Sequence, residues 1–124
     1  MQDADLRKRH KDFAIRIIHM VDAMPHTISA MAIARQIVRS GTSPSANYRA
    51  ACIAKSEKDF LNKLKMVEEE LDETLHWLEL ITECEMLPHD RMEDITRECT
   101  ELLKITVTSI VSTRRKINKE AQST

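Results

Sequence analysis

Residues 36–51 read QIVRSGTSPSANYRAA, and this stretch decides how the fold of the whole chain is interpreted. It holds the only glycine of the sequence, Gly41, and also Pro44, yet helix-forming residues flank it on both sides. One interpretation is a loop between two helices, because Ser-Gly-Thr-Ser-Pro is a typical chain-breaking sequence. The other is one helix with a kink, in which Pro44 cannot donate a hydrogen bond to the Ser40 carbonyl. Tyr48 follows Gly41 at helical spacing, so the residues alone leave both interpretations open.

The composition of the 124 residues predicts one all-α domain that spans residues 1–124. One glycine and 3% aromatic residues are too few for the turns and strands of a β protein. With 42% hydrophobic and 31% charged residues, the chain is expected to fold and to be soluble. No apolar run approaches the roughly 20 residues of a membrane span, and the three cysteines form no CxxC pair. We therefore expect a cytoplasmic protein without membrane contact.

Four amphipathic segments follow one another along the chain. Apolar residues recur at spacings of three, four and seven, which predicts helices over about 4–24, 27–54, 57–86 and 89–119. Thr27 is a candidate N-cap for the second helix, and the Ser-x-x-Asp sequence from Ser56 is one for the third. Short links between the segments predict an up-down-up-down four-helix bundle.

The third helix carries apolar residues on two sides. The first set repeats like a heptad and predicts the core-facing side, whereas the second set lies partly off that stripe. We expect one side to pack within the bundle and part of the other to meet a second subunit. The first set is Phe60, Leu64, Val67, Leu71, Thr74, Leu78 and Ile81, and the second is Leu61, Leu75, Trp77 and Leu80.

The formal net charge of −1 conceals a segregated distribution. Residues 1–55 carry nine basic and four acidic side chains, and residues 56–101 carry five basic and fifteen acidic ones. Residues 102–124 carry five basic side chains and one acidic one. A basic first half and a basic tail are therefore expected to lie beside the acidic third quarter.

A polar cluster is predicted on the second helix, with Glu73 of the third helix as its partner. Its members on the second helix fall at or near helical spacing, so they share one face. The favoured interpretation is a polar network that fixes the register of two helices, and the alternative is a ligand site. The cluster comprises Gln36, Arg39, Ser40, Ser43, Asn47 and Glu73.

Basic residues near both ends of the chain are candidate nucleic-acid contacts. Lysine and arginine clusters bind phosphates electrostatically, although the sequence pI near 6.5 and the scarcity of aromatic residues do not favour this function. The candidates are Arg7, Lys8, Arg9, Lys11, Arg114, Arg115 and Lys116.

Sequence motifs for catalysis or metal binding are incomplete. Glu73 and His76 match the Glu-x-x-His element of di-metal bundles, but such a site needs a second copy that the sequence lacks. The serine and threonine hydroxyls of residues 40–45 have no adjacent candidate base. The sequence therefore predicts a protein that is not an enzyme and that holds no cofactor or metal.

Three pieces of the sequence resemble one protein family. They are Gln36-x-x-Arg39-Ser40-x-x-Ser43-Pro44-Ser45-x-Asn47, then Ser56-x-x-Asp59-Phe60, and then Glu73. Together they resemble the bacterial four-helix-bundle proteins known as 23S rRNA intervening-sequence proteins. Ala50 departs from the family pattern, which has a glutamate at that place.

The resemblance implies properties that the residues alone do not. It implies a continuous, kinked second helix and a homo-oligomer, with five subunits as the typical number. It gives no settled biochemical role, and the function predicted from the two-sided third helix and the segregated charge is that of a non-enzymatic, homo-oligomeric adaptor. The alternative is an RNA- or DNA-binding accessory protein that acts with ribosomal RNA or a reverse transcriptase, as in related accessory proteins of diversity-generating retroelements.

Overall fold

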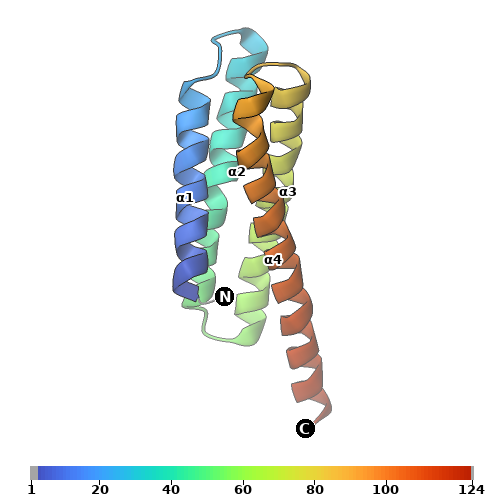
Figure 1. Ribbon diagram of the computed structural model, residues 1–124. Helices are drawn as coiled ribbons and strands as arrows, with labels where there is room; N and C mark the ends of the chain where they lie inside the picture. Colours follow the sequence, from blue (N-terminus) through green and yellow to red (C-terminus); the bar gives the residue numbers. More distant parts are fainter. Residues whose placement is uncertain (1–2, 124) are drawn as a thin grey trace.

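The computed structural model describes residues 3–123, and Figure 1 shows its helices packed side by side. They are α1 (Asp3–Asp22), α2 (Ile28–Cys52), α3 (Glu57–Glu83) and α4 (His89–Gln122). Each helix packs on the next one along the chain, whereas α1 contacts α4 only lightly. The all-α four-helix bundle with sequential packing is thus confirmed.

Side-chain hydrogen bonds begin two of the helices. The Thr27 hydroxyl accepts from the backbone N–H of Ala30 at 3.2 Å, and the Ser56 hydroxyl accepts from that of Asp59 at 3.0 Å. Each bond satisfies one of the N–H groups that the first helical turn leaves without a backbone partner. Both predicted N-caps are therefore confirmed.

Helix α3 ends at Glu83, three residues before its expected end. Glu85 has a φ of 54°, and its N–H bonds to the Thr82 carbonyl at 3.1 Å. The Met86 N–H bonds to the Ile81 carbonyl at 2.9 Å. These two bonds form a Schellman motif, which closes the helix with a residue in the left-handed region.

The other helix ends also differ from the expected ones. Helices α1 and α2 each end two residues early, because the following N–H groups bond three residues back rather than four. Ala54, for example, bonds to the Ala51 carbonyl at 3.1 Å. Helix α4 continues to Gln122, three residues beyond its expected end, through good helix formers. In Figure 1 its C-terminal part runs past the connection between α2 and α3.

The core lies between the four helices and follows the predicted stripe of α3. Every member of that stripe from Leu64 to Ile81 is buried, and Phe60 is partly buried at its edge. Leu61, Leu75 and Trp77 of the second apolar set are half-buried against the same core. Within residues 3–123, no helix has both the length and the apolar character that a membrane span requires.

Helix α2 runs without interruption through Pro44, so the loop interpretation is wrong. Gly41, Pro44 and Tyr48 are all buried on this helix. Burial against neighbouring helices offsets the hydrogen bond that Pro44 cannot make. The kink expected at Pro44 remains a prediction.

Gly41 lies where α1 and α2 approach each other closely. A Cβ atom at this position would lie 2.9 Å from both Cγ1 and Cγ2 of Ile17, a side chain with no exposed surface. Only glycine fits there without movement of a neighbour. The single glycine thus sets a helix–helix distance instead of ending a helix.

Candidate functional site

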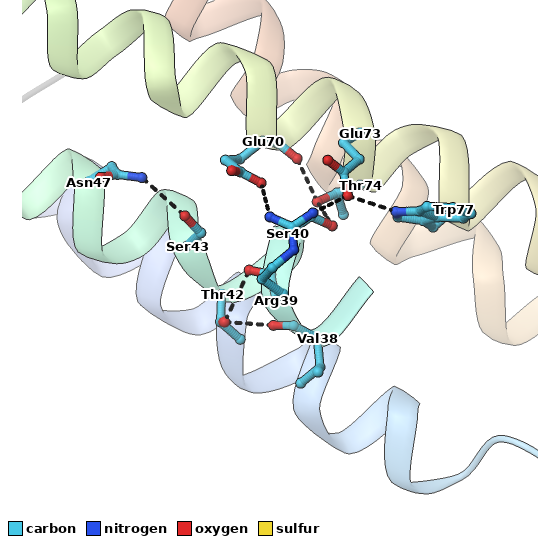
Figure 2. A network of polar contacts seen from close by, with 10 residues as sticks. All are labelled: Val38, Arg39, Ser40, Thr42, Ser43, Asn47, Glu70, Glu73, Thr74 and Trp77. Atoms are coloured by element: carbon cyan, nitrogen blue, oxygen red, sulfur yellow. Dashed lines mark hydrogen bonds and ion pairs between the residues drawn. The ribbon is translucent and has the colours of Figure 1, made fainter. Parts of the chain in front are cut away.

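Arg39 joins α2 to α3 through two carboxylates, as Figure 2 shows. Its Nη1 donates to Oε2 of Glu70 at 2.9 Å, and its Nη2 donates to Oε2 of Glu73. The indole N–H of Trp77 donates to the same Glu73 oxygen at 3.1 Å. The basic second helix is therefore tied to the acidic third helix at this point.

Ser40 makes the buried polar contact of the cluster. Its side chain has no exposed surface, and its Oγ lies 2.9 Å from Oγ1 of Thr74 (Figure 2). Oγ1 of Thr74 also lies 2.7 Å from the Glu70 carbonyl oxygen. Because each hydroxyl has one proton, Thr74 donates to that carbonyl and Ser40 donates to Thr74. A sliding of α2 along α3 would break this buried contact.

The remaining members of the predicted cluster are Gln36, Ser43 and Asn47, and the hydrogen bond between Asn47 and Ser43 lies within α2. Asn47 Nδ2 donates to Ser43 Oγ at 3.0 Å, and both side chains are partly buried. Gln36 is exposed. The structure thus brings Arg39 and Glu73 together across the two helices, whereas Ser43 and Asn47 bond within one helix.

Sequence reasoning missed three partners on α3, namely Glu70, Thr74 and Trp77. Thr74 and Trp77 follow Glu70 by four and seven residues, so the three share one face of the helix. A search of α3 for polar side chains at this spacing could have found them. The heptad-like spacing alone places Thr74 in the core stripe.

The polar groups of the Arg39 cluster bind one another. Both of its carboxylates bind the same guanidinium, and the hydroxyls of Ser40 and Thr74 are used in hydrogen bonds. The Arg39 side chain is 50% exposed, so each ion pair contributes at most about 1 kcal/mol. The contacts of the cluster join α2 to α3, and its role in fixing the helix register remains a prediction.

The other candidate reactive groups are also engaged or buried. Glu73 is bound by Arg39 and Trp77, and His76 packs on Trp77 with ring centroids 4.9 Å apart. Over residues 3–123, no three His, Cys, Asp or Glu side chains come together as a metal site. Burial raises the pKa of the Cys99 thiol to about 12, an effect that the charges of Asp72 and Glu98 reinforce.

Arg9, a predicted nucleic-acid contact, joins α1 to α4 through two carboxylates. Its Nε donates to Glu98 at 3.1 Å and its Nη2 donates to Glu101 at 2.9 Å. The hydrogen bond to Glu98 raises the pKa of Arg9 above its ordinary value, although partial burial opposes this. This ion pair spans the α1–α4 seam, where the helices have few other contacts.

Two predicted lysines also make ion pairs. Lys116 Nζ lies 2.5 Å from Glu57 Oε1 and joins α4 to the start of α3, while Lys8 Nζ lies 2.7 Å from Asp12 Oδ2 within α1. In each case the hydrogen bond to the carboxylate raises the pKa of the lysine. Arg114 and Arg115 are exposed on the C-terminal part of α4.

A basic groove runs between α1 and α2. Arg7, Lys8 and Lys11 line it from α1, and Arg49, which the sequence prediction missed, lines it from α2. Among the described residues that line this groove there is no carboxylate. The hydroxyl residues Thr42 and Ser45 and the apolar residues Ala4, Ala14, Ile18 and Ala46 complete the wall. An anionic chain would meet four basic side chains there, of which Lys8 is paired with Asp12.

The seven predicted cations are thus divided by the structure. Three of them join Arg49 in the basic groove, and Arg9, Lys116 and the two arginines of the α4 tail are outside it. Arg49 lies within residues 36–51, but only the packing of α2 on α1 places it beside Lys11. No sequence signal short of the helix–helix register could have found it.

Comparisons with known proteins give a family and similar solved structures. The family model described as 23S rRNA-intervening sequence protein matches residues 2–108. A crystal structure of a protein of unknown function from the S23 ribosomal protein family of Bacteroides thetaiotaomicron VPI-5482 is 34% identical to this chain. The similarity covers 85% of this chain and 97% of that one, with a TM-score of 0.79. A comparison with curated proteins finds no match. The chain therefore belongs to the 23S rRNA-intervening sequence protein family.

Proposed function

We propose that this protein is a non-enzymatic, homo-oligomeric adaptor whose subunits associate through the outer surfaces of the bundle. The observation that carries the proposal is the set of branched apolar side chains on the outside of α1 and α4. Ile15 and Ile18 on α1 are each 42% exposed, and Val107 and Val111 on α4 are 40% and 41% exposed.

The two valines are the strongest candidates for an interface. They stand one helical turn apart on α4, so they form one continuous apolar strip. Leu103, one turn before Val107, is partly buried and extends the strip toward the core. Burial of such a strip against a second copy would remove apolar surface from water, which is the main driving force of association. The family resemblance suggests five subunits.

An adaptor without catalysis fits the state of the reactive side chains. The Cys99 thiol is buried, Glu73 is held by Arg39, and the Thr42 hydroxyl donates to the Val38 carbonyl at 2.6 Å. None of these groups is poised to attack a substrate or to move a proton.

The test is the mass in solution of the wild type and of two charge variants. Size-exclusion chromatography with light scattering at micromolar concentration should give the wild type a mass that is a multiple of 14.3 kDa, with five subunits as the expected number. Val107→Glu/Val111→Glu should dissociate the assembly, because it buries two charges in an apolar contact.

Thr108→Glu/Ser112→Glu is the matched control, since it adds the same charge to exposed positions of the same helix. It should leave the mass unchanged. A monomeric wild type would contradict the proposal. Dissociation by the control variant alone would place the interface on the other face of α4.

The basic groove between α1 and α2 favours a second candidate function, the binding of RNA. Its basic side chains come from two adjacent helices and no carboxylate lines the groove, although Lys8 binds the neighbouring Asp12 at 2.7 Å; phosphates bind to such lysine and arginine clusters. No aromatic residue lines the groove within the described chain, so base stacking is absent and binding should be independent of sequence. The family name makes 23S rRNA fragments the first probes.

Salt dependence distinguishes this function from unspecific association. Four phosphate contacts to a single strand should give a slope of log K against log salt of about −3, and Lys11→Gln/Arg49→Gln should halve it. Lys58→Gln/Lys65→Gln, which removes two exposed cations outside the groove, should change the slope little. Fluorescence anisotropy at several salt concentrations gives these values. Equal slopes for both variants, or no binding at low salt, would exclude the groove.

A further inference from the structure

A second cationic site lies on the other side of α1, at its seam with α4. Arg16 and His19 of α1 and Arg91 of α4 line one cavity of about 180 Å³. Met20 and Ile95, both buried, form its apolar floor. Two helices that touch lightly thus bring three nitrogen-bearing side chains to one point.

The charges at this point are not compensated within the described chain. Neither Arg16 nor Arg91 makes an ion pair with the side chains that the structure describes, those of residues 4–123. The carboxylate one turn before Arg16 is Asp12, which binds Lys8 at 2.7 Å. Further along the same seam, by contrast, the guanidinium of Arg9 is neutralised by two glutamates.

On the α4 side of the cavity, too, the nearest carboxylate along the helix binds another cation. Asp94 follows Arg91 by three residues, but it binds Arg97 at 3.1 Å. The cavity is therefore lined by two arginines and one histidine, with no acidic residue in its wall. Like charges that converge in this way favour an anion between them.

We propose that this cavity binds a phosphate group. Guanidinium forks bind phosphate oxygens in pairs, and the His19 ring offers a further N–H donor. A liquid water molecule occupies about 30 Å³, so a cavity of about 180 Å³ has room for the several oxygen-sized atoms of a phosphate. Donors from two helices surround the site, and this arrangement suits a tetrahedral anion better than a planar carboxylate.

Phosphate bound here would connect α1 to α4 where the bundle has least contact of its own. Ligand binding to the folded state alone raises the apparent stability. Phosphate should therefore raise the thermal unfolding temperature more than chloride does at the same ionic strength.

Isothermal titration calorimetry with inorganic phosphate at pH 7 and constant ionic strength tests the proposal. The wild type should bind phosphate, and Arg16→Gln/Arg91→Gln should weaken binding by about a hundredfold, roughly tenfold for each arginine. Arg91→Lys keeps the charge but loses the fork, so it should weaken binding by an intermediate factor. Arg35→Gln/Arg115→Gln removes two exposed arginines outside the cavity and should leave the affinity unchanged.

Two further measurements complete the test. Circular dichroism should show that every variant keeps its helices, so that a loss of binding reports on the site. A short RNA with a 5′-phosphate, compared with its 5′-hydroxyl form, identifies the source of the group. A preference for the 5′-phosphate that Arg16→Gln/Arg91→Gln abolishes would assign a nucleic-acid end, and phosphate binding without that preference would assign a free phosphate ester. No response to phosphate beyond that to chloride, or equal responses in the variant and its control, would overturn the proposal.

Discussion

Replacing Gly41 with leucine should lower the free energy of unfolding by about 3 kcal/mol, the upper part of the usual range for overpacking. A Cβ atom at position 41 would lie 2.9 Å from two atoms of Ile17, and Ile17 has no exposed surface into which it could move. The larger side chain would therefore push α1 away from α2 over the length of their contact. Urea denaturation monitored by circular dichroism measures the change.

Smaller variants separate steric overlap from helix propensity. Gly41→Ala gains about 1 kcal/mol of helix propensity but keeps the short contact with Ile17, so its net effect should be smaller than that of leucine. Ile17→Ala removes all three atoms that the new Cβ would meet. The double variant should then be more stable than the sum of the two single effects predicts. Strict additivity would mean that the contact between these two positions is not the cause.

Acidification from pH 6.5 to 4 should destabilise the protein through His10 by about 3 kcal/mol, in addition to the titration of its carboxylates. The imidazole is 1% exposed, and neither of its ring nitrogens has a hydrogen-bond partner among the described residues. Burial lowers its pKa from 6.5 to about 4; the positive charge of Arg9 acts in the same direction, and Glu98 opposes it.

The sign follows from the two protonation states of His10. The folded state keeps the ring neutral, whereas the unfolded chain takes up the proton at its ordinary pKa of 6.5. Stability is therefore complete above pH 6.5 and declines as the pH falls toward the folded-state pKa of about 4. Below that value both states carry the proton, and this contribution no longer changes.

His10→Phe is the matched variant for this effect. Phenylalanine can keep the stacking on Tyr48, whose ring centroid lies 4.9 Å from that of His10, and it leaves no buried nitrogen without a partner. Its stability at pH 7 should equal or exceed that of the wild type, and its loss between pH 7 and 4.5 should be smaller by about 2–3 kcal/mol. Parallel pH profiles for the two proteins would rule out His10 as the titrating group.

Much of the fold follows from local patterns in the sequence. The heptad-like ladder of α3, from Leu64 to Ile81, is a property of one helix and can be read without its neighbours. The hydroxyls of Thr27 and Ser56 act within three residues of their own positions, so their capping roles were also predictable. The path of the chain through Pro44 was not, because propensity favours a break there and only burial against other helices overrides it.

The candidate sites divide in the same way. The pairing of Arg39 with Glu73 could be predicted from the sequence, since a buried or half-buried charge on one helix needs an opposite charge on the next. The sequence pattern could not show that Arg9 forms an ion pair with Glu98, nor that Arg49 lines the basic groove together with Lys11. The convergence of Arg16 and Arg91 on one cavity was equally hidden, because 75 residues separate them in the chain.

The sequence by itself determined that this protein is a bundle of four helices, where two of them begin, which side of α3 is buried and to which family the chain is similar. These properties depend on spacings of three, four and seven residues and on short motifs, all of which lie within single segments. Only the tertiary structure decided which cations are free, which are paired and which meet across a seam. Those outcomes depend on the rotation and register of each helix against its neighbours, and packing sets both through contacts such as that of Gly41 with Ile17.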